Sequence, residues 1–185
     1  ILKENNPDAV IEEVIKSADI AMISQETVVN KTNKASGSPL YNTPTDLGDK
    51  LVDMGFDVFA LASNHVLDQG ANGALEAIEY WDSKNVIRTG IYEDASDLKT
   101  VRIQQVNGIK FAYVSITSHL SGLSVDPDKT SLKVLSLTDP YKSTDEVYEE
   151  IKNTITLAEE VADIVIVSMH WRQENVTTVP SGQVD

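Results

Sequence analysis

Three short polar segments follow apolar runs of the sequence and hold the side chains best suited to chemistry. They are residues 24–27 (Ser-Gln-Glu-Thr), 63–65 (Ser-Asn-His) and 170–171 (His-Trp). In α/β sheets, functional groups gather where the carboxyl ends of strands meet loops. An amide oxygen there can bind a hard divalent cation, and an imidazole can act as acid, base or metal ligand. The sequence therefore indicates a candidate site built from these three segments.

The Asn64–His65 pair has two interpretations. In the functional one, Asn64 is a metal ligand and His65 handles protons. In the structural one, Asn64 caps the helix that follows and His65 is incidental. The residues alone favour neither. Asp68 is a supporting candidate, because a carboxylate at the start of a helix more often accepts hydrogen bonds than binds metal.

Two further side chains follow the last apolar run. Trp171 lies directly after a predicted core strand, where a Trp is more often a packing residue than a ligand contact. Glu174 stands in an irregular segment, where a solvated carboxylate is as common as a functional one. We therefore treat both as supporting candidates rather than as the centre of the site.

The elements that must position these groups are visible in the hydrophobic pattern. Apolar spacing predicts helices over residues 7–17, 45–55, 71–83 and from residue 143 onward. Strands are predicted over residues 19–23, 57–62, 86–88, 101–106, 110–116 and 164–169, with the last in the centre of a sheet. Asn107-Gly108 predicts a hairpin. The alternation favours an α/β fold with a mixed, largely parallel sheet flanked by helices.

Composition excludes several classes of protein. The 185 residues are enough for one domain with a core of its own. The absence of Cys removes disulfides and thiolate ligands. A net charge of -14 argues against binding to nucleic acid, which needs a positive face. No apolar run reaches the roughly 18 residues of a membrane span.

The segment around Asn64 carries a family resemblance. Residues 61–70 resemble the Asn-Asn-His-x-x-Asp-x-Gly signature of CapA-type poly-γ-glutamate capsule synthesis proteins, with Ser63 in place of the first Asn. Residues 108–112 resemble the Gly-Ile-Lys-hydrophobic strand of the same family. This resemblance favours the functional interpretation of the Asn-His pair.

Two more motifs occur in the family's order. Residues 18–27 resemble a strand that ends in Asn-Leu-Glu, so Glu26 matches the family's acidic residue. Residues 167–174 resemble its His-Trp-Gly-x-Glu-Tyr motif, which gives His170 and Glu174 counterparts. Residues that depart from the family pattern are Ser24, Ser63, Arg172 and Asn175.

The resemblance implies a metallophosphoesterase-like four-layer αββα sandwich. It implies that Glu26, Asn64 and His170 bind one or two divalent ions, among which Mn, Fe, Zn and Mg are not distinguished, and that His65 is the catalytic group that protonates or contacts phosphate. The family's opening Gly-Asp motif and its late Gly-x-His-Pro-His motif are absent from residues 1–185. We therefore expect a single domain truncated at both ends, weak metal binding and little phosphatase activity from this chain alone.

The family's role implies a protein of capsule polymer synthesis, export or anchoring. Its partners would be the polymer or other membrane proteins of the capsule machinery. Because the chain starts without an initiator Met, we expect a preceding segment that anchors it to the outer face of the cell membrane. Two rival hypotheses are a non-enzymatic scaffold that binds polymer or protein, and an intracellular hydrolase whose resemblance to the family is superficial.

Overall fold

Helices and strands alternate along the chain. The computed structural model describes residues 7–171 and residue 178. The helices are α1 (Pro7–Ser17), α2 (Thr45–Asp53), α3 (Gly70–Asp82), α4 (Ala95–Leu98) and α5 (Thr144–Glu159). The strands are β1 (Met22–Ser24), β2 (Val58–Ala60), β3 (Ile87–Thr89), β4 (Ile91–Tyr92), β5 (Ile103–Val106), β6 (Ile109–Thr117), β7 (Lys133–Val134) and β8 (Ile164–His170).

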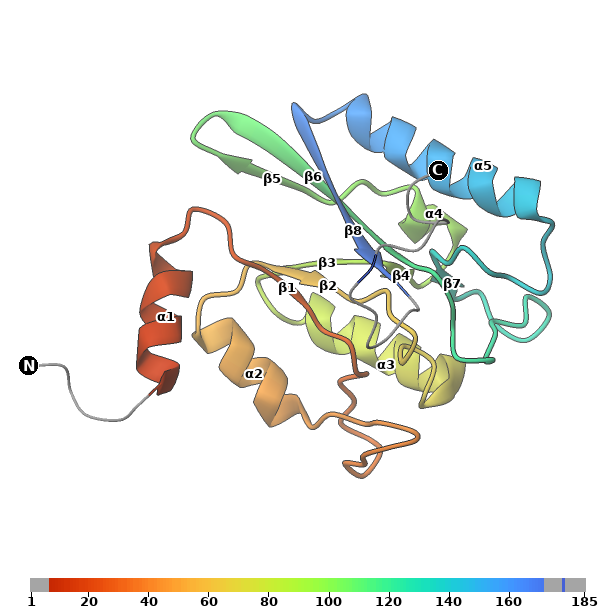
Figure 1. Ribbon diagram of the computed structural model, residues 1–185, viewed down its shortest axis with the longest axis horizontal. Coiled ribbons are helices and arrows are strands. Elements are labelled where there is room, and N and C mark those ends of the chain that lie inside the picture. Colours follow the sequence, from red (N-terminus) through yellow and green to blue (C-terminus); the bar gives the residue numbers. More distant parts are fainter. Residues whose placement is uncertain (1–6, 172–177, 179–185) are drawn as a thin grey trace, which may run out of the picture.

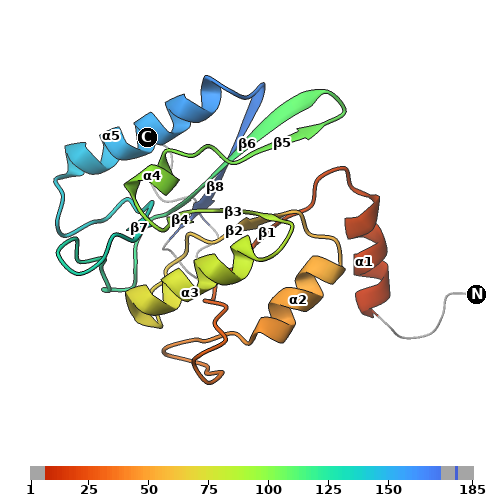
Figure 2. The same ribbon diagram turned by 180° about the vertical axis from the view of Figure 1, so that it is seen from behind.

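Two three-stranded sheets lie between two layers of helices (Figures 1 and 2). The first sheet has the order β1-β2-β3 and is parallel throughout. The second has the order β5-β6-β8, with an antiparallel β5-β6 pair and a parallel β6-β8 pair. Helices α2 and α3 cover the outer face of the first sheet, and α5 covers the second. The predicted four-layer αββα sandwich is therefore confirmed.

Each sheet packs its own apolar core against its helices. Below the first sheet, Phe59 of β2 stacks on Trp81 of α3 with ring centroids 4.1 Å apart. Above the second sheet, Val147, Ile151 and Ala158 of α5 are buried against β6. Their positions four and seven residues apart form one helical stripe, which is why α5 lies flat on the sheet.

The β5–β6 hairpin confirms the prediction made from Asn107-Gly108. Asn107 has a φ of 51° and Gly108 a φ of 85°. Val106 pairs directly with Ile109, so Asn107 and Gly108 form a two-residue turn. A turn with positive φ at both residues matches the twist of the strands. Local turn chemistry thus fixes the register of β6 at its amino end.

Strand β8 differs from its prediction as a central strand. In the described part of the chain it pairs with β6 alone, at an edge of the second sheet. Ile164 and Val167 remain 44% and 45% exposed there. A continuous apolar run is typical of burial on both faces, but it does not report how many neighbours a strand has.

Gly90 lies where the chain passes from β3 to β4, between the two sheets. Its φ is +102°, and a Cβ there would lie 2.6 Å from the backbone nitrogen of Ala62 and 3.0 Å from Cβ of Ser115. Next to it, the Thr89 hydroxyl donates to the carbonyl of Tyr113 across the sheets, at 3.1 Å. The sheets therefore approach closely only because residue 90 has no side chain.

Helix α5 begins with a capping box. Ser143 Oγ accepts from the backbone of Glu146, and the Glu146 carboxylate accepts from the backbone of Ser143. These two bonds satisfy amide groups that the helix leaves without partners. Hydrogen bonds from the backbone and hydroxyl of Ser143 hold the pKa of Glu146 below its ordinary value.

We expect Ser143→Ala to lower the free energy of unfolding by about 1 kcal/mol, because the helix loses its N-cap acceptor. Urea denaturation followed by circular dichroism measures this loss. The matched control is Ser96→Ala, which changes an exposed serine inside α4. Equal losses in the two variants would show that the capping box contributes nothing specific.

Among the helices of residues 7–171, none is both long and apolar enough to cross a bilayer.

Candidate metal centre

The segments that follow β1 and β2 are tied together at the carboxyl edge of the first sheet. The backbone nitrogen of Gln25 donates to the carbonyl of Ala60 at 2.9 Å. The Ser63 hydroxyl donates to the carbonyl of Glu26 and accepts from the backbone nitrogen of His65 at 3.1 Å. Parallel pairing of β1 and β2 and the Ser63 hydroxyl thus place Glu26 beside Asn64 and His65.

The second sheet brings His170 to the same place. Thr117 of β6 pairs with His170 of β8, and the backbone nitrogen of Ser118 donates to the His170 carbonyl at 2.8 Å. The His170 Nε2 atom lies 2.8 Å from Oδ1 of Asn64, across 106 residues of sequence. Residues from both sheets therefore meet at one point.

Glu26 completes a cluster of three side chains. Its Oε1 atom lies 3.8 Å from Nε2 of His170, which is too far for a hydrogen bond. Asn64 is only 5% exposed, whereas the side chains of His170 and Glu26 are 24% and 52% exposed. The cluster therefore runs from a buried amide to a carboxylate at the surface, and solvent can reach it.

Ser121 orients the amide of Asn64. The Asn64 Nδ2 atom donates to Ser121 Oγ at 3.2 Å, so Oδ1 is the atom that faces His170. Helix α3 begins at Gly70, and its N-cap residue is Gln69, five positions after Asn64. Asn64 is therefore not the cap of this helix, and the capping interpretation of Asn64 is wrong.

His65 is held by Asp68, beside the cluster. Its Nδ1 atom lies 2.7 Å from Asp68 Oδ2, so Nδ1 donates to the carboxylate and Nε2 is the ring nitrogen that can contact a substrate. Asp68 Oδ2 also accepts from the backbone nitrogen of Tyr41 at 2.8 Å. The Tyr41 ring meets the imidazole edge-on, with centroids 4.8 Å apart. The orientation of His65 is therefore fixed from two sides.

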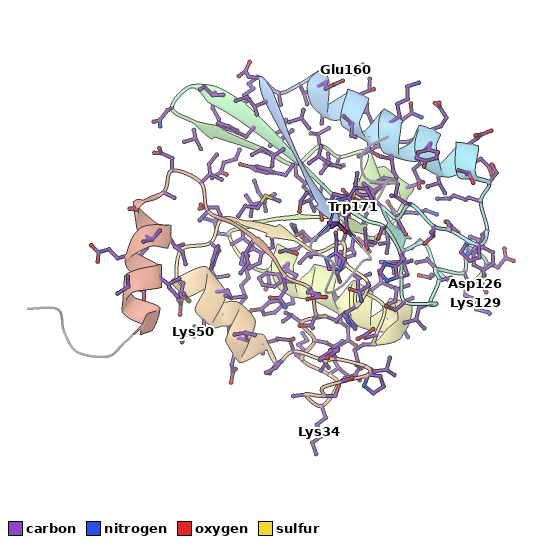
Figure 3. The ribbon with its side chains drawn as sticks, viewed as in Figure 1. Lys34, Lys50, Asp126, Lys129, Glu160 and Trp171 are labelled. Carbon is purple, nitrogen blue, oxygen red and sulfur yellow. The ribbon has the colours of Figure 1, made fainter. Side chains whose placement is uncertain are left out.

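Trp171 stands at the carboxyl end of β8, directly after His170 (Figure 3). The residue is 43% exposed, so it is not a core packing residue among the described residues. Glu174 lies outside the described residues. The structure thus brings Glu26, Asn64, His65, Asp68 and His170 into one region, and their chemical roles stay predictions.

The comparison with protein families agrees with these motifs. Residues 3–185 match the family described as "Bacterial capsule synthesis protein PGA_cap". The chain belongs to this capsule synthesis family. The hypothesis that the resemblance is superficial is therefore set aside.

Two Bacillus relatives carry the family's name. The chain is 27% identical over 133 residues to the capsule biosynthesis protein CapA of Bacillus anthracis, covering 66% of this chain and 28% of that protein. It is 33% identical over 125 residues to the PGA biosynthesis protein CapA of Bacillus subtilis (strain 168), covering 67% of this chain and 30% of that protein. The matched region spans less than a third of either relative.

A solved structure shows the same fold. A Staphylococcus aureus protein assigned as a 5'-nucleotidase, solved in complex with α-ketoglutarate, superposes with a TM-score of 0.53. The match has 20% sequence identity and covers 91% of this chain and 32% of the other. It establishes that the capsule synthesis chain has a metallophosphoesterase-like fold.

The donor atoms of the cluster fit part of a divalent metal site. Ligands about 2.1 Å from a common ion lie roughly 3.0–3.5 Å from one another, and the distances of 2.8 and 3.8 Å around His170 Nε2 bracket this range. Carboxylate, amide oxygen and imidazole suit Mn, Fe, Zn or Mg in different degrees. Within residues 7–171, no group of three or more His, Cys, Asp and Glu side chains could hold a metal ion. The cluster has only two side chains of these types, Glu26 and His170, together with the amide of Asn64. These three residues fit a metal site only as part of a larger set of ligands.

Sequence reasoning missed the residues that position the candidate ligands. Ser121 has a φ of 50°, and the Ser-Gly pair at 121–122 is a turn signal that marks an unusual backbone. Nothing in the pattern connects this turn to Asn64. Tyr41, between β1 and α2, likewise carries no sequence signal that would link it to Asp68.

We expect Asp68→Asn to lower turnover of a phosphoester by about 10–100-fold in the whole protein, because an amide holds the His65 ring less well and permits the other tautomer. Steady-state kinetics across pH would show a displaced pH profile with metal content unchanged. A variant that keeps the wild-type profile would contradict a positioning role for Asp68.

Proposed function

We propose that this chain supplies part of a divalent-metal centre for phosphoester hydrolysis in a cell-surface protein of capsule biosynthesis. Glu26, Asn64 and His170 are the proposed ligands. The observation that carries the proposal is their convergence, since they come from the ends of β1, β2 and β8 and meet within 4 Å of His170 Nε2. A bound ion would activate water and neutralise charge on the phosphoryl group.

The remaining residues have roles in handling protons and fixing geometry. His65 donates a proton to the leaving group or contacts a phosphoryl oxygen through Nε2, because Asp68 occupies its Nδ1 atom. Ser121 keeps Oδ1 of Asn64 turned toward the centre. Ser63 holds the backbone of Glu26 in register with that of His65.

The experiment that tests this proposal uses the whole protein. Divalent metal content is measured by mass spectrometry after purification, and turnover of bis(4-nitrophenyl) phosphate is measured with Mn, Fe, Zn and Mg added in turn. Stoichiometric metal together with turnover supports the proposal. Neither metal nor turnover under any supplement would overturn it.

A second candidate function is a non-enzymatic scaffold within a capsule-assembly membrane complex. The incomplete set of charged ligands among residues 7–171 favours it. Poly-γ-glutamate is the polymer that the family's role implies, but a chain with a net charge of -14 repels a polyanion unless a cation bridges them. A scaffold would bind partner proteins and hold no stoichiometric metal.

A further inference from the structure

A large groove lies next to the Glu26–Asn64–His170 cluster. Its volume is about 910 Å³, at the upper end of the range for sites that bind small organic molecules. One wall is formed by residues 119–124, in the loop after β6, and the other by residues 137–147, which lead into α5. In Figure 3 the labelled Asp126 and Lys129 mark this loop on the side of the first turn of α5.

Ser121 connects the groove to the cluster. It lines the groove and also contacts the amide of Asn64. The loop leaves β6 directly after Thr117, which pairs with His170. A molecule whose phosphoryl group lay at the cluster would therefore have a path for its organic part into the groove.

The lining combines hydroxyl groups with apolar surface. Its hydroxyl-bearing side chains are Ser121, Ser124, Thr138 and Thr144, and its aliphatic ones include Leu120, Leu123, Leu137 and Val147. A hydroxyl group both donates and accepts hydrogen bonds, so it can bind a hydroxyl group of a ligand as donor or as acceptor. Aliphatic side chains match the C–H faces of the same ligand.

The charge of the groove disfavours an anionic ligand. Lys142 is the one Lys or Arg among the described lining residues, and its ammonium group lies 2.7 Å from Glu150 and 3.4 Å from Asp139. Burial lowers the pKa of Lys142, but these carboxylates outweigh it and hold the pKa above its ordinary value. The cation is thus neutralised by the protein itself, and Asp139 also lines the groove.

We propose that this groove binds an uncharged, hydroxyl-rich group of the saccharide class. It follows, where the proposed function holds, that the substrate is a phosphoester of such a group rather than of an acidic peptide polymer. Only this second statement rests on the proposed function, since saccharide binding in the groove does not need the metal.

Saturation-transfer NMR on the whole protein tests the proposal with two probes, maltotriose and γ-linked triglutamate. We expect transfer to maltotriose at least threefold stronger than to triglutamate. Ser124→Trp fills the groove from an exposed position and should reduce the maltotriose signal at least fivefold. Ser96→Trp, on α4, is the matched control and should retain it. Thr144→Val, a smaller change, should weaken the signal about twofold.

No transfer to maltotriose, a stronger signal from triglutamate, or a signal that Ser124→Trp leaves unchanged would each overturn the proposal. Titration calorimetry with MnCl₂ on the same protein reports the metal centre separately. Manganese binding without saccharide transfer would contradict only the proposal that the groove binds a saccharide. Saccharide transfer without manganese binding would contradict only the proposed metal centre.

Discussion

His170→Ala is expected to raise the dissociation constant for Mn²⁺ by at least about a hundredfold in the whole protein, because it removes the imidazole between the other two donors. His170 Nε2 lies 2.8 Å from Asn64 Oδ1 and 3.8 Å from Glu26 Oε1. Asn64→Ala should have a similar effect, since it deletes the buried oxygen. Titration calorimetry measures the affinity, and phosphoester turnover should fall in parallel.

The control is Asn85→Ala, which changes an exposed Asn before β3, at the opposite edge of the first sheet from the cluster. Circular dichroism separates loss of metal from loss of fold. If His170→Ala keeps its fold and still binds Mn²⁺ as tightly as the Asn85 variant, the cluster is not the metal centre.

Gly90→Ala is expected to destabilise the chain by about 3 kcal/mol or more, as strain and overpacking each contribute about 1–3 kcal/mol. Residue 90 has a φ of +102°, and the new Cβ would lie 2.6 Å from the backbone nitrogen of Ala62. This neighbour is backbone in the segment that leads to Asn64, so it cannot rotate away. Urea denaturation measures the loss through its midpoint at unchanged slope.

Gly108→Ala separates the two contributions to this loss. Gly108 also has a positive φ, of +85°, but its added Cβ would meet no atom within 4 Å. We expect a loss of about 1–2 kcal/mol there from backbone strain alone. Equal losses at both positions would mean that the close approach of the sheets has no energetic weight.

Features that depend on residues close together in the sequence could be predicted from the sequence alone. Asn107-Gly108 predicts its hairpin because both residues accept positive φ, and the spacing of Val147, Ile151 and Ala158 predicts α5 because one helical face must be apolar. The family motifs around Asn64 and His170 likewise pointed to the residues that converge. Their ligand roles stay predictions, because convergence alone does not demonstrate metal.

Contacts between segments far apart in the sequence could not be predicted from it. Strands β4 and β7 have two residues each, too few for a periodic pattern. The partner of the Asn64 amide, Ser121, lies in a loop whose path depends on packing of the whole chain. The edge position of β8 also escaped prediction, because hydrophobicity reports burial and not the number of paired neighbours.

The contact between Asn64 and His170 also orders events during synthesis. All strands of the first sheet are complete in the sequence by Thr89, whereas β8 ends at His170. The growing polypeptide can therefore build the β1-β2-β3 layer with α2 and α3 while His170 is still inside the ribosome, because domains are synthesised from the N-terminus at about 5–20 residues per second. The three-donor cluster can form only afterwards. A metal ion would accordingly enter only after both sheets have formed, and metal starvation should yield folded protein instead of aggregates.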